Sequence, residues 1–409
     1  MKELQEKYAS VILNSCLKVK KGQPLFISAS SLVLDFVEIL KQKAKELGIE
    51  DIYLDITDPY EKHDLLLNLD LEELKSHPYF NKDKWNEYTK KGAAFAMLAS
   101  ETPNLMKDVD SKKLSDITIY AFNTRKEFDE SREKMKTPWC IAAVPTKEWA
   151  EEVIKEDNAL EKLWQKIFNI CQIDKDDPEE IWNQKINRLS RIATKLNEYN
   201  FKTLKYKNSL GTDFQIDLPK NHLWASGRET LTDGSEVLVN FPTEEIFTSP
   251  DCKSAKGIIY SSKPLCYQDN LIENFHLRFE NGQVIEYDAE KGKETLKNII
   301  ESCDNSNMLG EVALVEYDSP ISNSNTIFYE TLYDENASCH LALGDSFPEC
   351  IKGGINIPKE ELFTKYNLND CRNHVDFMVG TKDMTITGLT QDNQEIPIFE
   401  NGNFSIIFK

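Results

Sequence analysis

Residues 24–55 read PLFISASSLVLDFVEILKQKAKELGIEDIYLD, and this stretch decides the fold class of the first half of the chain. Residues 24–28 are a short, mostly apolar run of the kind that forms a buried strand. Residues 31–47 repeat apolar side chains at helical spacing, and Gly48 follows where a helix would end. Residues 51–55 alternate as a second strand. The order strand, helix, strand predicts a βαβ unit in a parallel sheet.

The same alternation continues to about residue 200. Further strands, each followed by a helix, are predicted at residues 93–98, 116–121 and 139–144, and a long helix is predicted at 178–199. Beyond residue 200, short alternating segments separated by turn signals predict a mostly β structure with a few helices. We therefore predict an α/β N-terminal domain with a mostly parallel sheet, residues 1–200, and an α+β, β-rich C-terminal domain, residues 201–409.

The composition limits the classes of partner. The chain has 409 residues and a formal net charge of −20, with 40% hydrophobic and 29% charged residues, which is the balance of a globular protein. Nucleic acids and anionic membranes attract an excess of Lys and Arg, so the acidic balance argues against both partners. No apolar run approaches the roughly 20 residues that a membrane-spanning helix needs.

The nine cysteines are odd in number and scattered, and they form no Cys-x-x-Cys pair. Neither a disulfide framework nor a Cys-ligated structural zinc is therefore expected. Charges interrupt the apolar positions of the N-terminus, which offers no signal-peptide core. These features predict a reduced, soluble, cytoplasmic protein. None of the predicted strand-to-helix turns carries GxGxxG or GxxxxGK[ST], which disfavours nucleotide binding.

Four segments of the C-terminal half place carboxylates or imidazoles among small or apolar residues. They are residues 241–250 with Glu244 and Glu245, residues 310–316 with Glu311, residues 334–344 with Glu335 and His340, and residues 373–380 with His374 and Asp376. Strand spacing puts His374 and Asp376 on one face. Each segment alone also has an ordinary explanation, such as a His–Asp hydrogen bond, a solvated turn, an exposed strand start, or a histidine satisfied by a carbonyl.

The combination of the four segments is more informative than any one of them. Four carboxylates and two imidazoles without a thiolate suit Zn²⁺, Co²⁺ or Mn²⁺. Six ligands exceed what one tetrahedral zinc ion can use. Two bridged divalent ions about 3.5 Å apart would use them and leave a site for water. The six candidate ligands are Glu245, Glu311, Glu335, His340, His374 and Asp376.

At these segments the sequence resembles the aminopeptidase T and aminopeptidase S family of metalloaminopeptidases. The matching strings are residues 240–250, 309–315, 331–344 and 374–380, and their order and the overall length also fit. The resemblance implies an enzyme that releases N-terminal amino acids from peptides through a metal-bridged water, with two divalent ions per subunit. It also implies a homodimer whose sites face a shared internal cavity. All six candidate ligands match the family's ligands, and Glu311 matches as the bridging carboxylate.

One position departs from the family pattern. Family members usually carry a Tyr seven residues after the ligand at His340, and here that residue is Phe347. A Tyr hydroxyl can donate a hydrogen bond to an oxyanion, whereas a Phe cannot. Two alternatives therefore stay open, namely a catalytically impaired metal-binding scaffold and a dinuclear hydrolase of another amide or ester. Glu244, beside Glu245, is the expected proton carrier to the leaving amine, unless it simply faces solvent.

Overall fold

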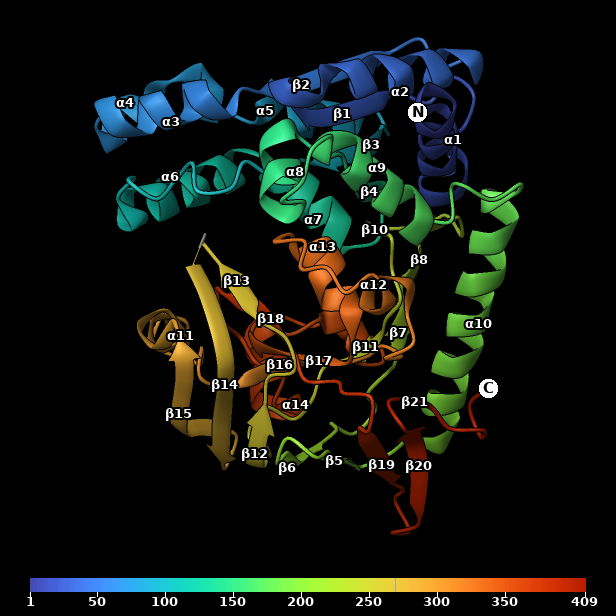
Figure 1. Cartoon of the computed structure of the whole chain (residues 1–409), viewed down its shortest axis with the longest axis vertical. Coiled ribbons are helices and arrows are strands. Elements are labelled where there is room, and N and C mark those ends of the chain that lie inside the picture. Colours follow the sequence, from blue (N-terminus) through green and yellow to red (C-terminus); the bar gives the residue numbers. More distant parts are fainter. Residues whose placement is uncertain (269) are drawn as a thin grey trace. The chain divides into compact units, whose positions relative to one another are not determined.

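The predicted βαβ unit is present in the computed structural model, which describes residues 1–268 and 270–409, apart from the side chain of Ser111. Its elements are β1 (Leu25–Ser30), α2 (Leu34–Glu46) and β2 (Ile52–Thr57). β1 pairs in parallel with β2 on one side and with β3 on the other. The complete sheet has the order β10-β4-β3-β1-β2, and all its pairings are parallel (Figure 1). The other three strands are β3 (Ala94–Ala99), β4 (Trp139–Ala143) and β10 (Asn240–Phe241).

Helices complete this α/β unit. An aromatic cluster containing Phe26, Trp85, Phe95 and Phe128 forms part of its core. Large aromatic side chains bury much apolar area, so a few of them contribute strongly to stability. The helices are α1 (Lys2–Val11), α3 (Pro59–Asn68), α4 (Leu71–Ser76), α5 (Asp83–Lys90), α6 (Ser111–Thr124), α7 (Lys126–Glu133), α8 (Lys147–Val153) and α9 (Ala159–Ile170).

The strand predicted at residues 116–121 is wrong, because these residues lie within α6. The side chain of Asp110 caps that helix by accepting a hydrogen bond from the backbone N–H of Lys113. Ile117 is buried in an apolar cluster, whereas Ile119 is 45% exposed, so the two do not share a strand face. The alternation of apolar and polar residues extends over only a few positions. The Asp110 cap and the packing of Ile117 favour the helix instead.

The second half of the chain contains two antiparallel sheets. The smaller has the order β18-β17-β16-β11-β7, and every residue of β16 and β17 is buried. Its strands are β7 (Ala225–Ser226), β11 (Ile246–Thr248), β16 (Leu309–Leu314), β17 (His340–Gly344) and β18 (His374–Met378). These two strands are therefore covered on both faces.

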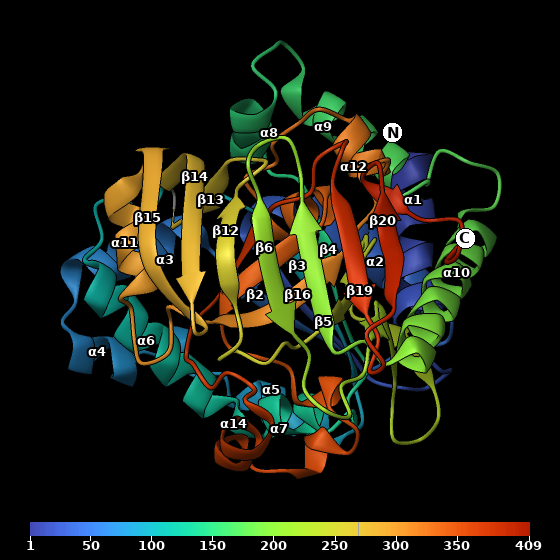
Figure 2. The ribbon, with the colours of Figure 1, turned by 90° about the horizontal axis from the view of Figure 1, so that it is seen from below.

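The larger sheet has the order β13-β14-β12-β6-β5-β19-β20-β21, with β15 paired to β14, and Figure 2 shows most of its strands side by side. Its strands are β5 (Thr203–Lys207), β6 (Asp213–Asp217), β12 (Lys256–Tyr260), β13 (Leu265–Tyr267), β14 (Asn270–Glu280), β15 (Gln283–Lys291), β19 (Thr385–Leu389), β20 (Glu395–Glu400) and β21 (Asn403–Phe404). The associated helices include α10 (Pro178–Tyr199), α11 (Lys293–Ile300), α12 (Pro320–Asn323), α13 (Thr331–Asp334) and α14 (Lys359–Tyr366).

The predicted fold class is confirmed, with a parallel α/β sheet in one part and antiparallel, β-rich structure in the other. Two compact units result, residues 1–184 with 228–242 and residues 185–227 with 243–409. The first unit also contains the short hairpin of β8 (Arg228–Thr230) and β9 (Glu236–Leu238). The division into functional domains at residue 200 stays a prediction.

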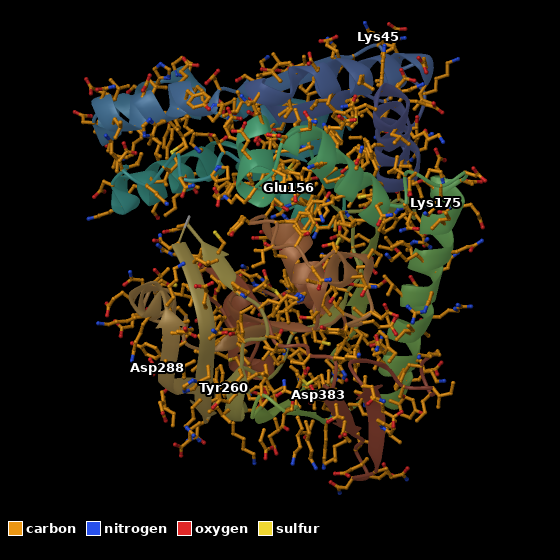
Figure 3. The ribbon with its side chains drawn as sticks, viewed as in Figure 1. Lys45, Glu156, Lys175, Tyr260, Asp288 and Asp383 are labelled. Carbon is orange, nitrogen blue, oxygen red and sulfur yellow. The ribbon has the colours of Figure 1, made fainter. Side chains whose placement is uncertain are left out.

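Charged side chains of both signs lie on the surface. The labelled residues Lys45, Lys175, Asp288 and Asp383 are exposed and extend from the ribbon in Figure 3. Within the part of the chain that the structure describes, no helix combines the length and the apolar character needed to cross a bilayer.

Candidate metal centre

Three neighbouring strands of the smaller sheet bring four of the six candidate ligands together. Glu311 of β16 pairs with Ala342 of β17, and Ala342 in turn pairs with Asp376 of β18. Paired residues of adjacent antiparallel strands project from the same face, so Glu311 and Asp376 flank the small Ala342 side chain. His340 and His374 each lie two residues from a member of this row and therefore share its face.

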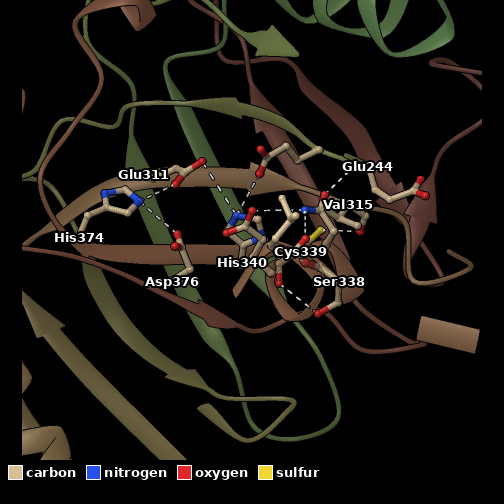
Figure 4. Close-up of polar contacts among 12 residues, drawn as sticks. Glu244, Glu311, Val315, Ser338, Cys339, His340, His374 and Asp376 are labelled. Carbon is tan, nitrogen blue, oxygen red and sulfur yellow. Dashed lines mark hydrogen bonds and ion pairs between the residues drawn. The ribbon is translucent and has the colours of Figure 1, made fainter. Parts of the chain in front are cut away.

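The distances show one carboxylate between two imidazoles. Glu311 Oε2 lies 3.1 Å from His374 Nε2, and Glu311 Oε1 lies 4.0 Å from His340 Nε2. His374 Nε2 is also 3.2 Å from Asp376 Oδ1, and His340 Nε2 is 3.3 Å from Glu245 Oε2. In Figure 4 the side chains of Glu311, His374 and Asp376 converge.

These contacts define two groups that can each hold a cation. One group is Glu245, Glu311 and His340, and the other is Glu311, His374 and Asp376, with ligand atoms within 4.8 Å of one another in each group. Atoms bound tetrahedrally at about 2.1 Å lie about 3.4 Å apart, so the observed spacings suit ligands of divalent ions. Glu311 belongs to both groups, and the donors are the oxygen and imidazole atoms that Zn²⁺, Co²⁺ and Mn²⁺ accept.

Hydrogen bonds orient the imidazole of His374 for ligation. Its Nδ1 atom lies 2.9 Å from the carbonyl oxygen of Asp345 and donates to it, which leaves Nε2 facing the carboxylates. Such a carbonyl partner fixes the ring orientation of a metal-binding histidine. Asp345 was missed from the sequence, because its contribution comes from the backbone and depends on the fold.

The buried carboxylates and imidazoles of the cluster shift one another's pKa values. Burial lowers the pKa of His340, but the carboxylates of Glu245 and Glu311 outweigh burial and raise that pKa to about 9. Burial raises the pKa of Glu311 to about 7. Burial also raises the pKa of Asp376, yet the attraction of His374 brings it down to about 2. Protons thus stabilise these buried acids in the absence of cations, and divalent ions can replace those protons.

Glu335 lies beside the cluster and outside both groups. It begins the 3₁₀ turn Glu335–Ala337 that follows α13, and its side chain lines a pocket together with His374 and Asp376. Removal from water, with repulsion by Glu245 and Asp376, raises the pKa of Glu335 well above its usual range.

Glu244 has a different environment from its neighbour Glu245. Its carboxylate forms an ion pair with Lys185 of α10. In Figure 4 its side chain points away from Glu311 and His340. The structure therefore brings Glu245 into the cluster and gives Glu244 another partner.

Asn336 is a buried polar residue that the sequence did not single out. Its Oδ1 atom accepts a hydrogen bond of 2.7 Å from the backbone N–H of Glu244, and its Nδ2 atom donates to the carbonyl of Leu332 at 3.1 Å. It thereby ties the segment of Glu245 to the segment of Glu335. The sequence signal for this role is limited to the position of Asn336 directly after Glu335.

Phe347 lies directly against the cluster. Its ring centroid is 5.1 Å from that of His374 and 5.3 Å from that of Phe247. Its backbone N–H donates to Ser249 Oγ at 2.8 Å, which anchors the segment. The position that departs from the family pattern is therefore adjacent to a candidate ligand.

The pocket next to the cluster has a volume of about 170 Å³. Apolar and acidic side chains share its wall, which suits a small ligand with an apolar side chain and a cationic or amine group. The lining residues lie in the second unit and include Leu265, Tyr329, Glu330, Glu335, Asp376 and Met378.

The fold and the buried carboxylate–imidazole cluster together define a candidate metal-dependent enzyme. More particularly, the chain belongs to the thermophilic metalloprotease (M29) family, whose family model matches residues 1–404. This membership agrees with the resemblance that the four segments indicated.

Similar proteins extend over nearly the whole chain. Aminopeptidase AmpS of Bacillus subtilis (strain 168) is 38% identical over 402 residues, which is 97% of each chain. Aminopeptidase 2 of Geobacillus stearothermophilus is 37% identical over 99% of this chain and 98% of its own. The solved structure of wild-type AmpT from Thermus thermophilus matches with a TM-score of 0.91 and 29% identity, over 99% of this chain and 100% of that chain. The prediction of a metalloaminopeptidase enzyme is confirmed by the family and by these relatives.

Proposed function

We propose that the chain hydrolyses N-terminal amino acids from peptides with two divalent ions, Zn²⁺, Co²⁺ or Mn²⁺, per subunit. Glu245, Glu311 and His340 would hold one ion, and Glu311, His374 and Asp376 the other. The observation that carries the proposal is the position of Glu311, whose two oxygens face different imidazoles. The aminopeptidase names of the relatives support the choice of substrate.

The proposed ligands and the residues around them have different roles in catalysis. When bound, two divalent ions acidify a water molecule and polarise a peptide carbonyl. The chain itself supplies the orientation of the ligands, through the hydrogen bond from His374 to Asp345 and through Asn336. Proton transfer to the leaving amine needs a carboxyl group that is not committed as a ligand.

Glu335 is our candidate for that proton transfer. Its place in the pocket wall, outside both ligand groups, supports this role. The raised pKa of Glu335 supports it further, because burial and nearby carboxylates favour the protonated form that a general acid needs. Two other assignments compete with this one, namely Glu335 as a sixth ligand and Glu244 as the proton carrier. The ion pair of Glu244 with Lys185 makes that residue the weaker candidate.

We also propose that the enzyme acts as a homodimer in the cytoplasm, with a free N-terminus as the feature that it recognises. The small volume of the pocket favours one amino-acid residue over a longer segment. Light scattering of the purified protein tests the dimer, because monomer and dimer differ twofold in mass.

The activity is tested with leucine and alanine p-nitroanilides and with a peptide whose N-terminus is either free or acetylated. We expect cleavage with added Co²⁺ or Zn²⁺, loss of cleavage with a chelator, and no cleavage of the acetylated peptide. Bound metal without any cleavage would instead favour the scaffold alternative. Cleavage of the acetylated peptide at a similar rate would favour a hydrolase of another amide or ester.

A further inference from the structure

Two cysteines outside the ligand set lie in contact. Cys303 Sγ is 3.0 Å from Cys371 Sγ, although 68 residues separate them in the sequence. Neither cysteine is in a disulfide. Cys303 follows α11 and is partly exposed, whereas Cys371 precedes β18 and is 8% exposed. Bonded sulfurs lie about 2.05 Å apart, so these two need to approach by about 1 Å to form a disulfide.

The two thiols differ in acidity. Partial burial raises the pKa of Cys303, but a hydrogen bond from Cys371 and backbone N–H groups of Arg372 and Asn373 outweigh burial and lower it. Burial and the hydrogen bond to Cys303 raise the pKa of Cys371 to about 11. Cys303 is therefore the more acidic and more nucleophilic thiol of the pair, and Cys371 is the thiol that can donate to it.

We propose that Cys303 and Cys371 form an oxidation site that closes a reversible disulfide when the protein meets a hydroperoxide. The Cys303 thiolate attacks the terminal peroxide oxygen, the O–O bond breaks, and an alcohol or water leaves once protonated, which gives a sulfenic acid. The Cys371 sulfur then attacks Cys303 Sγ, and the sulfenic oxygen leaves as water with the thiol proton. Both sulfurs are oxidised by one electron each, and the peroxide is reduced by two.

Two hydrogen bonds, both to Asp345, link the cysteine pair to the proposed metal centre. Cys371 lies three residues before His374, and its backbone N–H donates to Asp345 Oδ1 at 3.5 Å. The carbonyl of Asp345 accepts the Nδ1 hydrogen bond of His374. Metal–ligand distances tolerate changes of only about 0.2 Å, so the approach of Cys371 toward Cys303 is expected to weaken metal binding. This consequence rests on the proposed function, whereas the disulfide itself does not.

A second pair of neighbouring cysteines provides a contrast. Cys16 is hydrogen-bonded to Cys140, and both lie in the interior of the first unit with at most 1% exposure. Burial, followed by the hydrogen bond to Cys140, raises the pKa of Cys16 well above its usual range. Because both cysteines are buried and the pKa of Cys16 is raised, we expect no oxidation of this pair although the two side chains are in contact.

Peptide mapping tests the disulfide. The metal-loaded protein is treated with hydrogen peroxide, remaining thiols are blocked with N-ethylmaleimide, and the protein is digested with trypsin and Glu-C without reduction. These enzymes leave Cys303 in residues 302–311 and Cys371 in residues 366–372, each with a single cysteine. We expect a cross-linked pair of these two peptides that disappears after dithiothreitol.

Variants make the mapping specific. Cys303→Ser and Cys371→Ser should each abolish this cross-link, whereas Cys266→Ser, which removes another partly exposed thiol, should leave it intact. Irreversible oxidation of Cys303 without a cross-link, or cross-links scattered among other cysteines, would overturn the proposal.

The effect of the disulfide on metal binding is tested by measuring Zn²⁺ affinity, which needs no activity assay. Competition with a chromophoric chelator should give about 10- to 100-fold weaker Zn²⁺ binding after oxidation, as disturbed support of a ligand usually does. Dithiothreitol should restore the affinity, and Cys303→Ser should show no peroxide effect. Unchanged affinity in the cross-linked protein would overturn the coupling. A cross-linked protein that binds metal but never cleaves peptides would overturn only the proposed function.

Discussion

The ring of Phe347 packs against the imidazole of His374, with centroids 5.1 Å apart. The family resemblance leads us to expect a tyrosine at this position, so the contact places the departure beside a proposed ligand. A hydroxyl there would offer a hydrogen-bond donor beside the proposed metal site.

Phe347→Tyr is therefore expected to raise turnover. One oxyanion donor contributes about 10²–10³ in kcat where it acts, so we expect an increase of at least about tenfold. Steady-state kinetics on leucine p-nitroanilide measure it. Phe247→Tyr is the matched control, because that ring packs on Phe347 at 5.3 Å and its hydroxyl would lie elsewhere. Equal turnover in both variants and in the wild type would show that no donor is missing.

Glu335→Gln and Glu244→Gln separate the two candidates for proton transfer. We expect Glu335→Gln to lower kcat by about 10²–10⁴ with both metal ions retained. Glu244→Gln should keep turnover near that of the wild type, because it loses only the pairing with Lys185. Kinetics and metal analysis of the same preparations measure both effects.

The reverse results would identify other roles. Loss of an ion in Glu335→Gln would make Glu335 a ligand, as the sequence predicted. Lost turnover with intact metal content in Glu244→Gln would make Glu244 the proton carrier.

Asn336→Ala should destabilise the segment that carries Glu245. The change leaves the N–H of Glu244 and the carbonyl of Leu332 without their hydrogen bonds, at a cost of about 1–3 kcal/mol. Metal affinity should fall about tenfold, because the support of a ligand is lost. Urea unfolding and chelator competition measure the two effects. Wild-type values for both would show that Asn336 supports neither stability nor metal binding.

Protonation of His222 is expected to make the free energy of unfolding depend on pH. It is buried, its Nδ1 atom donates to the carbonyl of Pro219, and burial lowers its pKa to about 4. The unfolded chain binds a proton near pH 6.5, so stability falls as pH decreases from about 6.5 toward 4. At pH 5 this loss amounts to about 2 kcal/mol.

His222→Leu should remove that component. The free energy of unfolding is measured at pH 7.5 and pH 5.0 for wild type and variant, and the wild type should lose about 2 kcal/mol more. A substitution of His276 on β14 controls for the loss of any histidine. Identical pH dependence in His222→Leu and wild type would contradict the assignment.

Local signals in the sequence predicted the parallel sheet, because buried parallel strands are apolar runs that recur between helical patterns. They failed at residues 116–121, where Ile117 and Ile119 alternate like a strand although a capped helix forms. A stretch this short does not distinguish a strand from a helix, and only packing decides between them.

The candidate ligands were recognised by their residue types, but their arrangement was not. Glu311 and Asp376 meet across Ala342 because of a strand register that includes an irregularity between Leu309 and Glu311. The difference between Glu244 and Glu245 depends on Lys185, 59 residues away from Glu244. Such long-range pairings carry no local signal, so the ion pair of Glu244 with Lys185 could not be predicted from the sequence.

The central claim is that Glu311 bridges two ions, and metal stoichiometry tests it most directly. Protein loaded with Zn²⁺ and freed of excess metal is analysed by elemental mass spectrometry, together with Glu311→Gln, Glu245→Gln and Asp376→Asn. We expect two ions per chain in the wild type, about one in each of the last two variants, and almost none in Glu311→Gln. One ion per chain in the wild type, or two retained in Glu311→Gln, would contradict it.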